Sequence, residues 1–371
     1  MTQPARAARA ALCWIALLTA TLTSPALAGA APGPAQRAAA RQLLADAVTG
    51  PGITSTKARF AALDNRGKAL GTLKVIQVGD RYLGVYHSAG NGRYDVNLAT
   101  STDLMNWTYV TTLDTDATTP TIRQLSSGGF LIAYEKYLVD DFFESPLLTT
   151  ELDPLYNPLN RIQLRFRYYP SLDALLAGTF SRQFIARRSL SKISEGTPNI
   201  ISAHVTGGTL SHSRITVGLH YLKSLRRRPD SDRQGTGVLK DWKTWRATAQ
   251  PKLDRRILKT RLRHSGFTSP PTGSIGDRDD IVLDGVSLRL QEAEYVPRDW
   301  SSWRIFLMDP AHGGPAPLEI RTPRGSRSFS NPSVTQLTAP DGRPALFVSL
   351  FVLTEGADPY EQGQLIYYRE R

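Results

Sequence analysis

A repeated strand plan constrains the fold of this 371-residue chain more than any other feature of its sequence. Five segments share one order: a turn, a short strand, a glycine-containing hairpin, and then a strand of β-branched and aromatic residues. The five hairpins lie at Gly79-Asp80, Gly128-Gly129, Gly207-Gly208, Asp284-Gly285 and Asp341-Gly342. Asp-Gly and Gly-Gly pairs between such runs are typical of β-hairpins. The chain is therefore predicted to consist of five β-rich units.

Further strands follow most of these hairpins. Segments 94–101 and 108–113 follow the first hairpin, and segments 162–168 and 180–187 follow the second. A four-stranded unit of this kind cannot bury both of its faces alone, and radial stacking of such sheets gives a β-propeller. A two-sheet sandwich would account for the number of strands but not for their repeated order. We therefore predict an all-β fold, a five-bladed β-propeller, whose ring is closed by 364–370 against an N-terminal strand near 57–63.

The first 28 residues have the composition of a Sec-type signal peptide. Arg6 and Arg9 form a positive start, residues 10–22 are apolar, and Ala26-Leu27-Ala28 fits the rule for cleavage after small residues. We predict a signal peptide over 1–28, a flexible leader over 29–50 with a short helix at 35–48, and the propeller domain over 51–371. The protein is thus expected to be secreted. No other stretch approaches the ~18 apolar residues that cross a bilayer, so no membrane span is expected.

Composition and the absence of certain motifs exclude several classes of catalytic and metal chemistry. Cys13 is the only cysteine and leaves with the signal peptide, so the mature chain has no disulfide, zinc–thiolate site or cysteine nucleophile. The sequence has no P-loop, dinucleotide fingerprint, G-x-S-x-G or H-E-x-x-H motif. We expect a monomer.

The chain is basic, and part of its positive charge lies in two short stretches. Loss of two arginines with the signal peptide lowers the net charge from +12 to +10, which favours anionic partners. The basic stretches 223–228 and 252–263, expected in loops around the third blade, are either solvated surface or a rim that attracts an acidic glycan. Nucleic acid is not an expected partner, because no recognised binding motif accompanies the charge.

Propeller geometry selects a short list of candidate site residues. The first strand of each blade starts at one face of the central funnel and the second strand returns to it, so residues that open first strands and close second strands converge. The closing residues are His87, Glu135, His220, Glu292 and Phe351, and the opening residues are Asp116, Glu195, Asp277, Asp279, Asp280 and Asn331. Either these groups form a functional site, or they cap strands and bind a central water or ion.

The densest charged cluster at a strand opening is Gly276–Asp280. Arg278 could hold a carboxylate or a hydroxyl pair while Asp279 faces the funnel, or the cluster could be an Asp-rich turn with an internal ion pair. With His87 and His220 nearby, calcium held by carboxylates, carbonyls and water is an open alternative. No fixed ligand spacing supports a metal site, so we expect no metal ligand set and no required cofactor.

Three short motifs resemble those of a known enzyme superfamily. ATSTDLMNW at 99–107, TPTI at 119–122 and SEGTPNI at 194–200 resemble the five-bladed propeller glycosidases of glycoside hydrolase family 43 and its relatives: arabinanases, arabinofuranosidases and β-xylosidases. The resemblance implies that Glu195 is the general acid. Cleavage of a glycosidic bond needs a second carboxyl group. The candidates for it are Asp279, Asp277 and Glu135, and those for a third acid that tunes the pKa of the first are Asp116 and Glu135.

The chain departs from the family pattern in two places. The family places its base aspartate where the first blade opens, and here that strand opens with Leu70-Gly71-Thr72-Leu73. The nearest acid, Asp64, has the sequence context of a tight turn. Thr197 also interrupts the match between Gly196 and Pro198. Three alternatives follow. The catalytic base comes from another blade, the protein catalyses a different reaction from that of the family, or it binds its ligand without catalysis.

We expect a secreted glycoside hydrolase that acts on a plant or cell-wall polysaccharide or oligosaccharide, with Glu195 as the acid and Asp279 or Asp277 as the base or nucleophile. The expected substrate-binding residues are His87, His220, Asp116, Arg278, Glu292 and Asn331. Two alternatives stand beside this expectation. One is a non-catalytic sugar-binding propeller that uses the same funnel. The other is an extracellular protein whose basic loops dock to an anionic surface.

Overall fold

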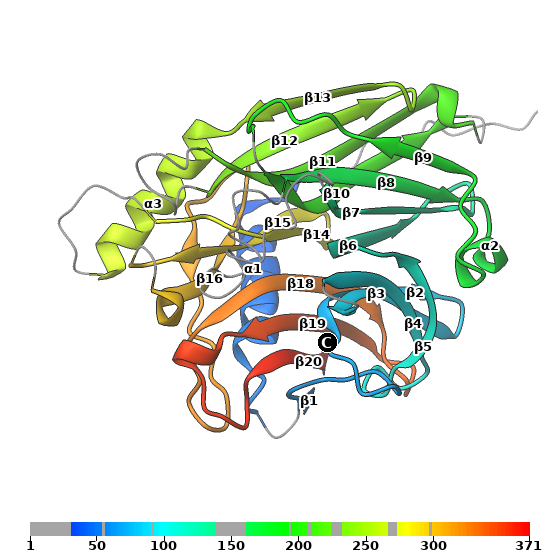
Figure 1. The fold of residues 1–371 in the computed structure, drawn as a ribbon. Helices are drawn as coiled ribbons and strands as arrows, with labels where there is room; N and C mark the ends of the chain where they lie inside the picture. Colours follow the sequence, from blue (N-terminus) through cyan, green and yellow to red (C-terminus); the bar gives the residue numbers. More distant parts are fainter. Residues whose placement is uncertain are drawn as a thin grey trace, which may run out of the picture.

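Five four-stranded antiparallel sheets surround a central axis in the computed structural model of the protein (Figure 1). This arrangement confirms the predicted five-bladed β-propeller. The structure describes residues 31–53, 56–90, 93–138, 161–192, 194–206, 209–223, 232–265, 273–296 and 299–371. The predicted signal peptide over 1–28 and the hairpin at 207–208 lie outside the described residues.

Blades 1 to 4 keep their strands in chain order from the axis outward. Blade 1 contains β2 (Gly71–Val78), β3 (Arg81–Ala89), β4 (Tyr94–Ser101) and β5 (Thr108–Asp114). Blade 2 contains β6 (Ala117–Gln124), β7 (Phe130–Leu138), β8 (Arg161–Tyr169) and β9 (Arg182–Ile185). Blade 3 contains β10 (Glu195–Val205), β11 (Ser213–Leu222), β12 (Asp232–Lys240) and β13 (Thr244–Ala249). Blade 4 contains β14 (Arg278–Leu283), β15 (Val286–Glu294), β16 (Trp303–Met308) and β17 (Ala316–Pro317).

Blade 5 combines the two ends of the domain, as predicted. It contains β18 (Phe329–Thr338), β19 (Pro344–Val352), β20 (Gly363–Glu370) and, as its outermost strand, β1 (Lys57–Arg59). β1 pairs antiparallel with β20, Lys57 lying opposite Tyr368 (Figure 1). This pairing ties the N-terminal segment of the domain to the last blade and so closes the ring.

Aromatic residues pack between neighbouring blades. Trp107, the last residue of the DLMNW motif, is 2% exposed and packs edge-to-face against Phe347 of blade 5, with ring centroids 6.3 Å apart. Asp103 caps the preceding turn, because its Oδ1 accepts hydrogen bonds from the backbone N–H of Met105 and of Asn106. Trp245 packs at a tilt against Phe166 of blade 2, with ring centroids 5.5 Å apart.

The innermost strands of blades 1, 2, 3 and 5 carry a β-bulge at equivalent positions, where the pairing register shifts. The bulged residues are Thr72, Thr119, Thr197 and Asn331, with φ between 40° and 50°. A positive φ is unfavourable for β-branched threonine, so the surrounding contacts hold this conformation. Each bulge also leaves a backbone N–H without a partner in the ladder, which another group must satisfy.

Two segments differ in part from the sequence expectation. The short helix predicted at 35–48 is present as α1 (Pro34–Thr49), but its Leu44 and Val48 are buried against blades 4 and 5. The hydroxyl of Tyr367 donates to the carbonyl of Val48 at 2.7 Å and fastens the end of the helix. This part of the leader is thus packed against the propeller instead of being flexible. Residues 252–263, predicted as loop, lie within helix α3 (Pro251–Ser265).

Short helical segments complete the structure. They are α2 (Leu172–Leu176) and the 3₁₀ turns η3 (Leu210–His212), η4 (Trp300–Ser302) and η5 (Thr354–Gly356). Among the described residues, no helix has the length and hydrophobicity to cross a membrane.

Candidate active site

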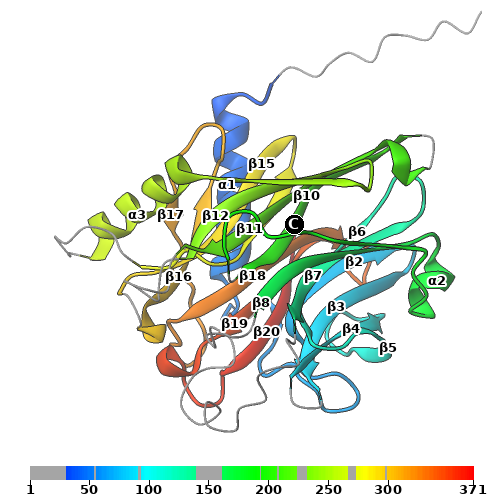
Figure 2. The same ribbon diagram turned by 45° about the horizontal axis from the view of Figure 1, so that its top comes forward.

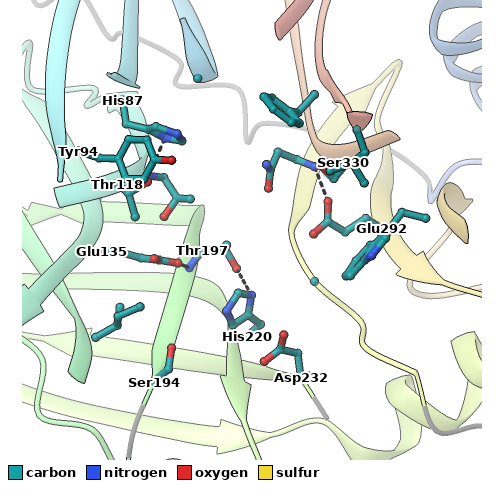
Figure 3. Close-up of a pocket in the computed structure, with 18 of the residues that line it drawn as sticks. His87, Tyr94, Thr118, Glu135, Ser194, Thr197, His220, Asp232, Glu292 and Ser330 are labelled. Atoms are coloured by element: carbon teal, nitrogen blue, oxygen red, sulfur yellow. Dashed lines mark hydrogen bonds between the residues drawn. The ribbon is translucent and has the colours of Figure 1, made fainter. Parts of the chain in front are cut away.

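A pocket of about 390 Å³ opens where the second strands of the blades end, and all five predicted closing residues line it. These residues are His87, Glu135, His220, Glu292 and Phe351. Asn331, predicted from a first-strand opening, lines it as well. Figure 3 shows the two glutamates on opposite sides of the pocket, with His220 between them. The propeller therefore brings together acids that lie far apart in the sequence.

The two pocket glutamates are buried and held by backbone donors. Glu135 is 3% exposed, and its Oε1 accepts a hydrogen bond from the N–H of Thr197 at 2.5 Å. Glu292 is 5% exposed; its Oε1 accepts from the N–H of Asp277 at 2.7 Å, and its Oε2 accepts from the N–H of Asn331. Each carboxylate oxygen has two lone pairs, so these bonds leave acceptor sites for a ligand.

Burial sets the protonation behaviour of both carboxyl groups. It raises the pKa of Glu292 to about 7, while the two backbone donors and the charge of His220 act in the opposite direction. Burial also raises the pKa of Glu135, again opposed by His220 and by the N–H of Thr197. Removing a carboxylate from water disfavours its charged form, which explains both shifts. Glu292 can therefore carry a proton near neutral pH.

The two histidines have different surroundings. His87 Nδ1 accepts from the backbone N–H of Thr119 at 3.3 Å, so its proton is assigned to Nε2. Thr72 Oγ1 lies 2.9 Å from the same nitrogen, and burial lowers the pKa of His87 to about 4. His87 is thus neutral at physiological pH. His220 Nδ1 lies 2.7 Å from Thr197 Oγ1, and its charge favours the ionised forms of both pocket glutamates.

Closing side chains also join neighbouring blades. The N–H of each bulged residue donates to a side chain of the preceding blade around the ring: Thr72 to Gln364, Thr119 to His87, Thr197 to Glu135 and Asn331 to Glu292. These four hydrogen bonds, called here the interblade bonds, satisfy buried donors that the ladder leaves unpaired. Part of the polar character of the closing positions therefore has a structural cause, as one of the two sequence interpretations held.

One wall of the pocket is aromatic and apolar. Trp300 and Trp303 stack nearly parallel, with an interplanar angle of 19° and centroids 5.9 Å apart, and Phe351 and Leu353 lie on the same lining. Across the pocket, Tyr94 packs edge-to-face on His87 at 4.9 Å. A pocket that combines an aromatic wall with carboxyl groups suits a ligand with one apolar face and several hydroxyl groups.

Glu195, the acid implied by the motif resemblance, does not line the pocket. It is 1% exposed, and its Oε1 accepts backbone hydrogen bonds from Ser189, Leu190 and Ser191 in the loop before β10. The next residue, Gly196, faces Glu135 instead: a Cβ built on it would lie 2.2 Å from Glu135 Oε1. Because successive residues of a strand point in different directions, the motif places Glu195 at the right point in the chain but turns its side chain away.

The two aspartates predicted as base or nucleophile also lie outside the pocket. Asp279 forms an ion pair with Lys74 at 2.5 Å and accepts from the N–H of Val334, which joins blades 4, 1 and 5 near the axis. Asp277 lines a separate axial cavity of about 30 Å³, where burial and the nearby Glu292 raise its pKa well above the usual range.

The remaining predicted site residues are structural or peripheral. Asp116 is partly exposed, 4.0 Å from Arg93, and Asp280 is paired with Arg289 at 2.7 Å. Arg278 is buried between blades 3 and 4, where its Nη2 donates to the carbonyl of Gly235 and burial lowers its pKa to about 9. The cluster at 276–280 is therefore not an Asp-rich turn: it leads into β14, its Asp279 and Asp280 pair with cations outside the cluster, and Gly276 is its only member on the pocket lining.

Sequence reasoning missed the residues that open the third strands. Tyr94, Ile162, Asp232 and Trp303 start β4, β8, β12 and β16 or lie one residue inside them, and all four line the pocket. Antiparallel pairing puts each of these positions opposite the residue two places after a closing residue, as Asp232 lies opposite Leu222, two residues after His220. The same convergence rule, extended by one strand, would have found them.

No group of three or more histidine, cysteine, aspartate or glutamate side chains is placed to hold a metal ion within the part of the chain that the structure describes. The calcium alternative therefore gains no ligand set from these residues.

No family model matches the protein, and no curated protein matches it. Solved structures do match. A structure described as a glycoside hydrolase has 12% identity and a TM-score of 0.56, with 90% of this protein and 96% of the matched one covered. A complex of BT0996 with RGII has 12% sequence identity, a TM-score of 0.54 and the same coverage of the two proteins. An exo-1,5-α-L-arabinanase from a bovine ruminal metagenomic library has 14% sequence identity and a TM-score of 0.49, with 84% of this protein and 95% of the matched one covered.

The protein is a five-bladed β-propeller whose fold is similar to those of the structure described as a glycoside hydrolase and of BT0996, at low sequence identity. At identities of 10–14% across these matches, what is shared is the fold.

Proposed function

We propose that the protein is a glycoside hydrolase that acts on a plant or cell-wall polysaccharide. The observation that carries the proposal is the pair of buried carboxyl groups, Glu135 and Glu292, that face one pocket from opposite blades (Figure 3). Hydrolysis of a glycosidic bond requires two such groups, one on each side of the bond. The glycoside hydrolases that share the fold, together with the protein in the RGII complex, support this reading.

In the proposed reaction, protonated Glu292 gives its proton to the leaving glycosidic oxygen. A pKa of about 7 suits a general acid near neutral pH. Glu135 acts as the base or nucleophile from the other side of the bond; burial raises its pKa, and the charge of His220 and the N–H of Thr197 oppose that shift. Trp300 and Trp303 stack on the apolar face of a sugar ring and orient it. We further propose that residues 1–28 direct the protein out of the cell.

Activity on arabinan, xylan and arabinogalactan, followed by release of reducing sugar, tests the proposal. Glu292→Gln and Glu135→Gln are each expected to lower kcat by about 10²-fold or more while retaining ligand binding. Glu195→Gln is the matched comparison, since it makes the same change in a buried glutamate outside the pocket. If Glu195→Gln abolishes turnover in a folded protein and Glu292→Gln does not, the assignment made from the motif is right and ours is wrong.

A second candidate is a sugar-binding propeller without turnover. It is favoured by the first strand of blade 1, which presents Gly71 to the pocket and has Thr72 at its bulge instead of a carboxylate. Binding of an oligosaccharide that Glu135→Gln or His87→Ala removes, together with the absence of released sugar, would establish this function in place of hydrolysis.

A further inference from the structure

Helix α3 has one face that is entirely basic among its described residues. Within 251–259 the exposed side chains are Pro251 and four cationic residues: Lys252, Arg255, Arg256 and Lys259. Spacings of three and four residues place these four on one side of a helix. At about 1.5 Å per residue they cover ~10 Å of helix length. We call this set the α3 basic face.

The opposite side of α3 is anchored to the propeller. Ile257 and Leu258 are buried with Ile275, Ala293 and Phe306 in one apolar cluster. Asp254, the only acid in the helix, is turned inward, where its Oδ1 accepts from the N–H of Gln234 at 3.0 Å and burial raises its pKa to about 6. The helix therefore holds its cations in fixed positions and offers them no carboxylate of its own.

The described residues leave the charges of the α3 basic face uncompensated. None of its four side chains forms an ion pair with a described carboxylate; Arg255 contacts the carbonyl of Pro251 and Arg256 that of Gly313. Arg41 of α1 reaches the same loop, since a Cβ on Gly313 would lie 2.9 Å from its Nη1. Clustered exposed cations without counter-charges produce a positive potential that attracts a polyanion.

The buried side of α3 packs against residues that adjoin the pocket lining in the chain. Ile275 and Ala293, which anchor the helix, are the chain neighbours of Gly276 and Glu292 on the pocket lining. Figures 1 and 2 show α3 at the outer edge of the molecule, next to β12 and β16. A long polymer bound along α3 can thus reach the pocket with a neighbouring segment.

The pocket and the helix differ in charge. The described pocket lining includes the carboxylates of Glu135, Asp232 and Glu292 but no lysine or arginine. An acidic sugar is repelled there, whereas the helix repels a cationic one. This division suits a polysaccharide that contains both acidic and neutral units.

We propose that the α3 basic face is a docking site for the uronic-acid segments of an anionic polysaccharide; the inference rests on the proposed function of the neighbouring pocket. The described outer face of α3 has no large apolar side chain to insert into a membrane. It has no aromatic side chain on which nucleic acid bases could stack. A carboxylate-bearing glycan needs neither, because its charges are spaced along a flexible chain that the row of cations can follow.

The test compares two variants of the full protein that lose the same charge. K252Q/R255Q/R256Q/K259Q neutralises the α3 basic face, and R182Q/K240Q/K243Q/R246Q neutralises four exposed cations on blades 2 and 3. Binding to immobilised polygalacturonate and to its fully methyl-esterified, uncharged form is measured at about 50 mM and about 500 mM salt. Turnover or binding of a neutral oligosaccharide is measured separately.

The expected result is selective loss. The α3 variant binds polygalacturonate about ten-fold or more weakly and with a flatter salt dependence, whereas the control variant changes less than about two-fold. Both variants keep the wild-type response to the neutral oligosaccharide, so failure of the hydrolase proposal is distinguishable from failure of this one. Equal loss in both variants, equal binding of the esterified polymer, or stronger binding of anionic vesicles or DNA than of polygalacturonate would overturn the docking proposal.

Discussion

Substitution of Glu292 by glutamine is expected to change how stability depends on pH. Burial raises the pKa of Glu292 from its ordinary value of 4.5 to about 7 in the folded protein. Between these values the unfolded chain has lost a proton that the folded protein keeps. The contribution of Glu292 to the free energy of unfolding is therefore fully present below pH 4.5 and is lost as the pH rises through about 7. The difference between the two pKa values corresponds to ~3 kcal/mol of unfolding free energy.

Urea unfolding at about pH 5, 6, 7 and 8 measures this effect. Glutamine cannot accept hydrogen bonds with both of its terminal atoms, so Glu292→Gln leaves one of the two donor N–H groups unsatisfied and is less stable than the wild type by ~1–3 kcal/mol at low pH. The wild-type advantage shrinks by ~3 kcal/mol as the pH rises, so that the variant is at least as stable as the wild type at about pH 8. Glu319→Gln, at an exposed carboxyl group, is the control and should run parallel to the wild type. A constant difference between wild type and Glu292→Gln across this range would refute the assigned protonation.

Three further predictions concern the pocket, the axis and the blade contacts. Gly196→Ala places a Cβ against the carboxyl group of Glu135, so turnover should fall while circular dichroism shows a retained fold; unchanged kinetics would contradict the placement. Lys74→Met leaves Asp279 buried without its cation and should cost ~3–5 kcal/mol in urea unfolding, with Lys74→Met/Asp279→Asn recovering part of the loss. Trp107→Ala should cost ~3–5 kcal/mol by opening a cavity between blades 1 and 5, and a loss below about 1 kcal/mol would show that the contact is dispensable.

The blade arrangement was predictable from the sequence because it depends on local signals. Hairpin turns such as Asp284-Gly285 and alternating strands mark each unit, and closing residues such as Glu135 and His220 follow from counting strands. Their convergence on one pocket follows from the geometry of a propeller, and the structure confirms that they line one pocket.

The direction of the Glu195 side chain was not predictable, because it depends on the bulge that follows in β10. The pairing register shifts between Gly196 and Asn199, and a shift of one residue exchanges the two faces of a strand. The motif resemblance places a glutamate near the pocket but carries no information about that shift. The packing of α1 was equally out of reach, since the helix is held by blades that end hundreds of residues later in the chain.

Helix α3 shows the opposite case, in which a readable signal was missed. Leu253, Ile257 and Leu258 have helical spacing within the basic stretch. Attention to the charges alone led to the prediction of a loop.

Blade 5 has a consequence for how the protein is made. Its outermost strand, residues 57–59, pairs with residues 363–370, whose synthesis follows that of the four other blades. The neighbouring β19 and β20 also complete the surface on which α1 rests. Until blade 5 has been synthesised, the chain therefore has neither a closed ring nor a finished pocket. Assembly of the site needs both ends of the domain at once.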